Sequence, residues 1–238
     1  MSIIDYVNRE NYEQLSETTA KIIIDYVTKN PEALLCMAGG DTPIGTYKIL
    51  VEAHLKGLVD FSNCKFVGLD EWLGLDPKKP GSCRSYLQHH LFDPIHIKEE
   101  NIAFFNSIAD DLQSELNRID SFVEENGPID ISLLGVGVNG HLGFNEPYSK
   151  IDQNAHIVEL DETTQAVGKK YFDGEATTTR GITLGLNQLL QSKVIIIVAS
   201  GATKISAITA LKEGKYLPEK PVTALNAHPN CFVILAID

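Results

Sequence analysis

Three polar side chains closely follow one of the apolar runs of the chain. The run Ile129–Val136 leads into a glycine-rich turn that contains Asn139 and His141, and Glu146 follows five residues after the histidine. A histidine held beside a carboxylate can transfer protons near neutral pH. Glycines let a backbone approach a ligand closely or take a positive φ. We interpret the segment as an acid–base site at a strand end; a connecting turn with a packed histidine is the simpler alternative.

A pair of acids follows a shorter apolar run, Lys65–Leu69. Asp70 and Glu71 come directly after that run. Neighbouring side chains of an extended strand point to opposite faces, so the two carboxylates cannot both face one site. We expect Asp70 to face the site and Glu71 to pack or pair elsewhere. Solvation at the surface is the alternative for such a pair.

A turn of small residues has the composition of an anion site. Gly39, Gly40 and Thr42 follow the apolar run Ala33–Ala38 and precede an amphipathic segment. Backbone N–H groups at the start of a helix attract phosphate. The turn lacks the Gly-Lys-Ser/Thr ending of a P-loop, so ATP is not implied. Thr42 also qualifies as the helix cap, and Asp41 would repel an anion unless it faces away.

Two cations are available for the same anion. Lys204 lies in the turn after the run Lys193–Ala199, and Arg180 precedes another apolar stretch. A lysine at a helix start suits a phosphoryl or carboxylate group. Spacing alone does not separate the two, and a surface arginine is the simpler interpretation of Arg180. Because no cluster has the spacing of metal ligands, we expect no metal, and we expect His89 and His90 to pack or face solvent.

The elements that must position these residues alternate along the chain. Apolar strands that alternate with amphipathic helices are typical of a mainly parallel sheet with helices on both faces. We therefore expect an open, Rossmann-like α/β fold in a single domain over residues 1–238. The irregular segments 76–81 and 148–179 are candidate covers of the site. The expected strands are 33–38, 65–69, 129–136, 193–199 and 231–237, and the expected helices are 11–28, 43–58, 110–125 and 203–213.

Composition limits the class of protein. The 238 residues are 43% apolar and carry a formal net charge of −12. That charge opposes binding to nucleic acid and to anionic membranes. The four cysteines are far apart and are interpreted as buried thiols of a reducing compartment. The chain begins without a basic and apolar leader and has no apolar stretch long enough to span a membrane, so we expect a cytoplasmic protein.

Taken together, the motifs resemble those of the amino-sugar-6-phosphate isomerase/deaminase family. The resemblance spans nearly the whole chain, and its most specific part is the segment Gly135–Pro147. It implies a fold of the sugar-phosphate isomerase/6-phosphogluconolactonase type, a small phosphosugar substrate, and no metal or organic cofactor. The other motifs that carry it are Gly39-Gly-Asp-Thr-Pro43, Leu69-Asp-Glu-Trp72, Gly201-Ala-Thr-Lys204 and Ala227-His-Pro229.

The resemblance also implies a role for each catalytic candidate. Asp70 would move a proton from C2 to C1 of the sugar, His141 would open the sugar ring, and Glu146 would orient His141. Asn139 stands where some members have an aspartate, so it can only hydrogen-bond. Where the glucosamine enzymes have an arginine for phosphate, this chain has Lys170. The candidate cations for phosphate are therefore Lys170, Arg180 and Lys204.

The substrate is the finer question within the family. Three motifs are more similar to the galactosamine 6-phosphate branch, so we expect conversion of galactosamine 6-phosphate to tagatose 6-phosphate and ammonia. Deamination of glucosamine 6-phosphate to fructose 6-phosphate is the alternative. A 6-phosphogluconolactonase-type hydrolase is a further alternative, and it would not need Asp70 as a carbon base. A sugar-phosphate sensor without activity is disfavoured because both Asp70 and His141 are present. The three motifs are Leu69-Asp-Glu-Trp-Leu, Pro80-Gly-Ser-Cys and Arg180-Gly-Ile-Thr-Leu-Gly-Leu.

The sequence leaves open whether the protein is a monomer or a homo-oligomer.

Overall fold

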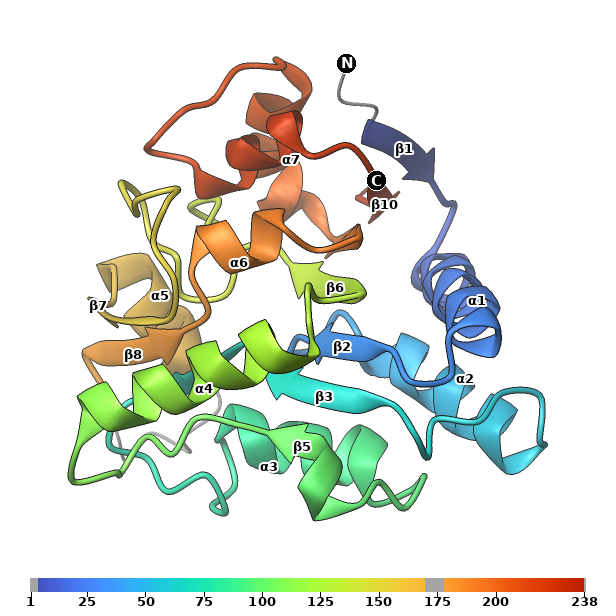
Figure 1. Cartoon of the computed structure of the whole chain (residues 1–238). Coiled ribbons are helices and arrows are strands. Elements are labelled where there is room, and N and C mark those ends of the chain that lie inside the picture. Colours follow the sequence, from blue (N-terminus) through green and yellow to red (C-terminus); the bar gives the residue numbers. More distant parts are fainter. Residues whose placement is uncertain (1–3, 170–177, 238) are drawn as a thin grey trace.

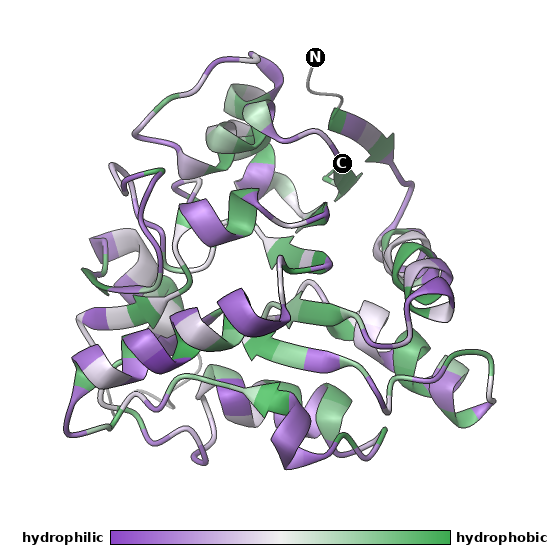
Figure 2. Cartoon of the chain, in the orientation of Figure 1, coloured by the Kyte–Doolittle hydropathy of each residue, from purple (hydrophilic) through white to green (hydrophobic). Residues whose placement is uncertain are grey.

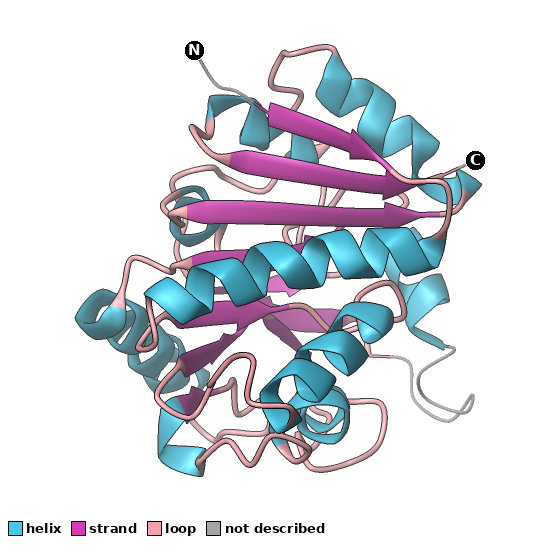
Figure 3. Cartoon of the chain, turned by 90° about the vertical axis from the view of Figure 1, so that its right-hand side faces the viewer, coloured by secondary structure: helices cyan, strands magenta, loops and turns pink. Residues whose placement is uncertain are grey.

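A seven-stranded sheet is the main element of the fold. The computed structural model describes residues 4–169 and 178–237. Every pair of neighbouring strands in this sheet is parallel, in the order β1-β10-β9-β6-β2-β3-β5. In Figure 3 the uncovered strands in the upper half of the sheet lie side by side and point the same way. The expected parallel α/β fold is thus confirmed. The strands are β1 (Ile4–Asn8), β2 (Leu34–Met37), β3 (Lys65–Gly68), β5 (Ile102–Ala103), β6 (Ile131–Gly135), β9 (Val194–Ser200) and β10 (Cys231–Ala236).

Helices cover both faces of the sheet (Figure 1). The first two helices pack on one face, and the fourth and seventh pack on the other. The four helices expected from the sequence are all present, with ends shifted by one to three residues. The α-helices are α1 (Tyr12–Lys29), α2 (Ile44–Leu55), α3 (Cys83–Leu87), α4 (Leu112–Asn126), α5 (Glu162–Gly168), α6 (Leu186–Leu190) and α7 (Ile205–Lys212). Short turns of other helix types are η1 (Gln88–Phe92), η2 (Glu99–Asn101), η4 (Ala202–Lys204) and η5 (Pro221–Ala227).

Burial on both faces explains why the central strands are continuous apolar runs. In β2, Leu34 and Cys36 belong to the core on the α4 side, whereas Leu35 and Met37 belong to the core on the α1 side. Side chains of a strand alternate between faces, so a strand covered on both sides needs apolar residues at every position. Figure 2 shows these strands mostly green, the colour of hydrophobic residues.

A second, antiparallel sheet of three strands begins where β3 ends. Its order is β4-β8-β7, with Asp70 of β4 paired with Thr183 of β8. The sequence pattern did not predict this sheet. It placed the Asp70 acid pair after a strand, and it left the region of β7 without regular structure. The strands are β4 (Asp70–Trp72), β7 (His156–Glu159) and β8 (Arg180–Thr183).

Thr42, which qualified as a helix cap, does not cap helix α2. Helix α2 begins after Pro43, and no side chain caps it. Instead, the N–H group of Gly45 in the first turn donates to the phenol oxygen of Tyr12, at 2.8 Å. A helix α1 side chain therefore satisfies a donor that a cap residue would otherwise satisfy.

A buried carboxylate holds together the amino-terminal ends of the central strands, which lie opposite to the predicted site. Asp130 precedes β6 and accepts hydrogen bonds from the phenol of Tyr26, at 2.7 Å, and from the Leu34 N–H group, at 2.9 Å. Its Oδ1 atom also accepts from Lys193, at 2.8 Å. These contacts tie α1, β2 and β9 to the start of β6, so Asp130 has a structural role.

Two further expectations concern thiols and membranes. All four cysteines are free; Cys36, Cys64 and Cys231 are buried, and Cys83 is partly buried. In the described ranges, no helix combines the length and the apolar character that crossing a bilayer requires.

Candidate active site

A cavity of about 230 Å³ lies at the carboxyl ends of the central strands. It occupies the edge where ligands of open α/β sheets bind. Its wall includes residues that follow β2, β3 and β6, so it joins three segments that are far apart in the sequence. Of the residues predicted for the site, those that line the cavity are Gly39, Gly40, Thr42, Asp70, Asn139, His141 and Lys204.

Asp70 is a buried carboxylic acid in the cavity wall. Only 8% of the residue is exposed. Burial raises its pKa from the ordinary value of 3.8 to about 6, while the Cys83 thiol and the charge of His141 act in the opposite direction. Near neutral pH the group is therefore mostly ionised and can accept a proton, and it returns that proton more readily than an ordinary aspartate.

Glu71 faces away from the cavity and forms part of the support of Asp70. Its carboxylate accepts hydrogen bonds from the N–H groups of Trp72 (2.9 Å), Cys83 (3.0 Å) and Arg84 (2.9 Å). Burial raises the pKa of Glu71 to about 7, against the effect of these three donors. The predicted division between an inward and an outward acid is confirmed.

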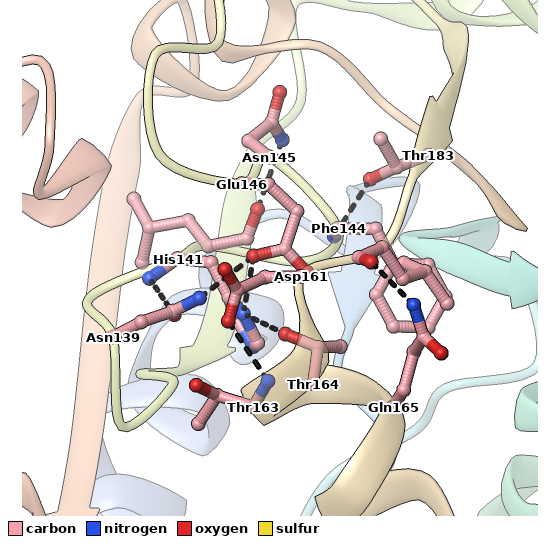
Figure 4. Close-up of polar contacts among 12 residues, drawn as sticks. Asn139, His141, Phe144, Asn145, Glu146, Asp161, Thr163, Thr164, Gln165 and Thr183 are labelled. Atoms are coloured by element: carbon pink, nitrogen blue, oxygen red, sulfur yellow. Dashed lines mark hydrogen bonds and ion pairs between the residues drawn. The ribbon is translucent and has the colours of Figure 1, made fainter. Parts of the chain in front are cut away.

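His141 and Glu146 form the predicted pair, shown in Figure 4. Nδ1 of His141 lies 3.3 Å from Oε2 of Glu146 and 3.0 Å from the hydroxyl of Thr164. An ionised carboxylate can only accept, so this contact favours the tautomer that has its proton on Nδ1. Nε2 is then left for a ligand in the cavity that the histidine lines.

Asn139 connects both members of the pair. Its amide nitrogen donates to Oε2 of Glu146, at 2.8 Å, and its amide oxygen accepts from the N–H group of His141, at 3.1 Å. Burial raises the pKa of Glu146, but the contacts with His141, Thr164 and Asn139 outweigh burial and leave the pKa below its ordinary value. Glu146 is thus held ionised behind the histidine.

A glycine makes room for the imidazole ring. A Cβ atom at Gly137 would lie 2.4 Å from Nε2 of His141. Contacts this short do not occur, so any side chain here would displace the ring. Gly137 therefore sets where the histidine can lie in the cavity.

Helix α5 contributes residues that the sequence analysis missed. Thr163, Thr164 and Val167 line the cavity from the segment 148–179, which was expected only as an irregular cover. Asp161 caps the helix by accepting from the Thr163 N–H group, at 2.9 Å. An aspartate two residues before this N–H is an ordinary start signal, and it could have located the helix.

The candidate cations do not share one location. Lys204 lines the cavity, from the end of the turn η4. Arg180 is not among the described lining residues; its side chain pairs with Glu159 at 3.1 Å. Lys170 lies outside the described residues. Of the two candidates that the structure describes, Lys204 lines the cavity and Arg180 does not.

Aromatic side chains form another part of the wall. The rings of Trp72 and Phe144 are 4.6 Å apart, and both residues line the cavity. A Cβ atom at Gly168 would lie 2.6 Å from the Trp72 ring, so the last residue of α5 packs closely on the indole. This contact fixes α5 beside the cavity. Across the residues that the structure describes, no group of three or more His, Cys, Asp or Glu side chains could hold a metal ion.

The fold and the cavity define an α/β protein with an acid–base cluster at the carboxyl edge of a parallel sheet. Comparison with known families agrees with this class. The model of the family of glucosamine-6-phosphate isomerases and 6-phosphogluconolactonases matches residues 8–233. The chain belongs to this family.

Its relatives cover almost all of the chain. The glucosamine-6-phosphate deaminase of Thermoanaerobacter pseudethanolicus is 38% identical over 226 residues, which are 94% of this chain and 89% of the relative. The enzyme of the same name from Lysinibacillus sphaericus is 36% identical over 96% of this chain and 97% of its own. The solved structure of a monomeric glucosamine-6-phosphate deaminase is 35% identical, with a TM-score of 0.95 over 98% of this chain and 97% of that one.

A more distant structure shares the fold alone. The 6-phosphogluconolactonase from Thermotoga maritima is 16% identical, with a TM-score of 0.78 over 99% of this chain and all of that one. The expected type of fold is thereby confirmed, whereas the family predicted from the motifs is confirmed by the family model and by the relatives named above.

The raised pKa of Asp70 predicts a cost in stability. The folded pKa lies above the unfolded value, so the folded state binds the proton more tightly, and stability falls as pH rises from about 4 to about 6. Asp70→Asn removes this cost. We expect its free energy of unfolding in urea to match that of the parent near pH 4. Above pH 6 it should exceed the parent value by up to about 3 kcal/mol.

Asp130→Asn is the matched control, because Asp130 is also buried but lies at the opposite edge of the sheet. It should lose stability, since Asp130 accepts three hydrogen bonds. An equal gain for Asp70→Asn at both pH values would contradict the assigned pKa.

Proposed function

We propose that the protein is an isomerising deaminase of an amino-sugar 6-phosphate, with glucosamine 6-phosphate as its substrate. One observation carries the proposal. A buried carboxylate, Asp70, and an oriented histidine, His141, line the same cavity as a glycine turn and a lysine suited to phosphate. The names of the relatives support glucosamine as the amino sugar. The galactosamine expectation rested on three short motifs, and the relatives fit the glucosamine alternative better.

The proposed chemistry begins with opening of the sugar ring. His141 moves a proton between the ring oxygen and the C1 hydroxyl, which yields the open aldehyde. Asp70 then takes the proton from C2, the electrons of the C–H bond form the C1–C2 double bond, and the carbonyl electrons move to O1, which takes a proton from the ammonium group of the substrate to give an enolamine. Return of the proton to C1 gives an iminium at C2. Water adds to that carbon and ammonia leaves, so the products are fructose 6-phosphate and ammonia.

The environments of the two groups suit these roles. The same carboxylate can serve as base and then as acid because burial brings the pKa of Asp70 to about 6. Glu146 holds the imidazole in one tautomer, which keeps Nε2 available to a sugar oxygen. We assign Glu146 and Asn139 to orienting His141. We assign binding of the substrate phosphate to Gly39, Gly40, Thr42 and Lys204.

The remaining expectations are part of the proposal. Residues 1–238 act as a single domain, in the cytoplasm, with no metal and no organic cofactor. A monomer is supported by the structure that is 35% identical and described as monomeric. We assign no part in phosphate binding to Arg180, because its side chain pairs with Glu159 and is not among the described residues that line the cavity.

A panel of substrates tests the function. We expect ammonia release from glucosamine 6-phosphate with the highest kcat/KM, weaker release from galactosamine 6-phosphate, and none from unphosphorylated glucosamine. Loss of 6-phosphogluconolactone is measured in parallel. If the lactone is consumed and no amino sugar releases ammonia, the hydrolase alternative is correct. A higher kcat/KM for galactosamine 6-phosphate would restore the expectation from the motifs.

The role of Asp70 predicts a loss of turnover with binding retained. Asp70→Asn keeps the volume of the side chain but removes the proton acceptor. We expect kcat to fall at least about a hundredfold, the contribution of a positioned acid or base. The dissociation constant of glucosamine 6-phosphate, measured by calorimetry, should change little. Asp130→Asn should keep kcat within a fewfold of the parent, and near-normal turnover by Asp70→Asn would remove Asp70 from the mechanism.

The contact between His141 and Glu146 predicts non-additive losses. Each of His141→Gln and Glu146→Gln should lower kcat, because an imidazole without its carboxylate loses both its orientation and its tautomer preference. The double variant should be little worse than His141→Gln alone. His156→Gln is the control, since that buried histidine bonds to the Asn154 carbonyl and is not among the described lining residues. Strictly additive losses would mean that Glu146 acts independently of His141.

A further inference from the structure

Three tyrosines from three helices each hold one carbonyl group of the turn between β2 and α2. The turn covers residues 38–43, and each of its residues lines the cavity. The tyrosines are 9 to 46 residues away from the carbonyls that they contact. The contacts run from the Tyr47 phenol to the Ala38 carbonyl, from the Tyr86 phenol to the Gly40 carbonyl, and from the Tyr12 phenol to the Asp41 carbonyl.

These contacts also orient the N–H groups of the turn. In a trans peptide, the carbonyl of one residue and the N–H group of the next point in opposite directions. Holding the Ala38 carbonyl therefore directs the N–H group of Gly39 the opposite way. In the same manner, the bond to the Gly40 carbonyl orients the N–H of Asp41, and the bond to the Asp41 carbonyl orients the N–H of Thr42.

The N–H groups of Gly39 and Thr42, which belong to the first and last of the three peptides, point toward the cavity. Tyr47 is fully buried in the core on the α1 side, and Tyr12 is 39% exposed on α1. Neither of these two tyrosines lines the cavity among the described residues, whereas the turn and Tyr86 do, so a direction is assigned to the peptides after Ala38 and Asp41 and not to the peptide after Gly40. The carbonyls of Ala38 and Asp41 thus point away from the cavity. In the described part of the chain, the N–H groups of Gly39 and Thr42 donate to no other group.

Orientation matters because a peptide group has two ends of opposite charge. A carbonyl oxygen that faced the cavity would repel an anion, and an N–H group attracts one. Burial raises the pKa of Tyr47 well above its ordinary value, so its phenol stays a donor at every pH of interest. Tyr12 has a second function, because its oxygen also accepts from the Gly45 N–H group at 2.8 Å. The turn is therefore fixed before any ligand binds.

We propose that Tyr12, Tyr47 and Tyr86 are positioning residues, which pre-orient the 38–43 turn to receive the phosphate of the substrate. The inference deepens the proposed function and rests on its assignment of phosphate to this turn. It assigns the tyrosines no contact with the reacting carbons. Their loss should weaken binding of the phosphate end and leave the chemical step almost unchanged.

Phenylalanine variants test the proposal, because they keep the ring and remove only the hydroxyl. For each of Tyr12→Phe and Tyr86→Phe, we expect KM for glucosamine 6-phosphate to rise by about twofold to tenfold. This factor corresponds to the net free energy of one hydrogen bond. The inhibition constant of inorganic phosphate should rise by the same factor, and kcat should stay within twofold. Tyr47→Phe should act in the same way if it folds, and its melting temperature is measured first.

Tyr26→Phe is the matched control. Its phenol also makes one hydrogen bond, to Asp130 at the opposite edge of the sheet, so any general effect of losing a phenol appears there. We expect it to lower the melting temperature without changing KM or phosphate affinity. The proposal is overturned if Tyr12→Phe and Tyr86→Phe leave phosphate affinity unchanged, or if they lower kcat at constant KM.

Direct calorimetry with inorganic phosphate separates this proposal from the deaminase assignment. If the parent protein binds phosphate and the two variants bind it more weakly, the tyrosines position the turn even if no amino sugar is deaminated. If the parent releases ammonia but the variants bind phosphate as the parent does, the function stands and the role of the tyrosines fails. Failure of the parent to bind phosphate at millimolar concentration would also overturn the role.

Discussion

The buried carboxylate of Glu71 is the constraint on which the rest of the site depends. It is completely inaccessible, and its two oxygens accept three backbone N–H groups, one from β4 and two from the start of α3. A buried acid without such donors would be strongly unfavourable, so the strand and the helix must stay together. Because neighbours on a strand face opposite sides, this arrangement also turns Asp70 into the cavity. The same contacts place α3, and with it Tyr86.

The small antiparallel sheet joins the two halves of the site. Thr183 pairs with Asp70 across β8 and β4, and its hydroxyl accepts from the Phe144 N–H group at 3.2 Å. Phe144 belongs to the turn that carries His141. A Cβ atom at Gly143 would lie 2.9 Å from the Thr183 hydroxyl, so that turn approaches β8 as closely as a backbone can. The carboxylate and the histidine are therefore held relative to each other through β8.

Local sequence pattern predicted the parts of the structure that have a local cause. The central strands are buried on both faces, so their apolar runs were visible, and the residues after those runs were correctly brought to one edge. The strand Asp70–Trp72 was missed because it is short and partly polar, and it exists through pairing with β8. The bond between Thr164 and His141 spans 23 residues and has no local signal. For the same reason, nothing near Arg180 in the sequence revealed its pairing with Glu159.

Trp72 is the only tryptophan of the chain, and it stands in the wall of the cavity. Its indole ring packs against Phe144 and against the end of α5, and only 6% of the residue is exposed. The ultraviolet emission of the whole molecule above the tyrosine band therefore comes from one position next to the site. Occupancy of the cavity can be followed optically in the unlabelled protein, with no other indole contributing to the signal.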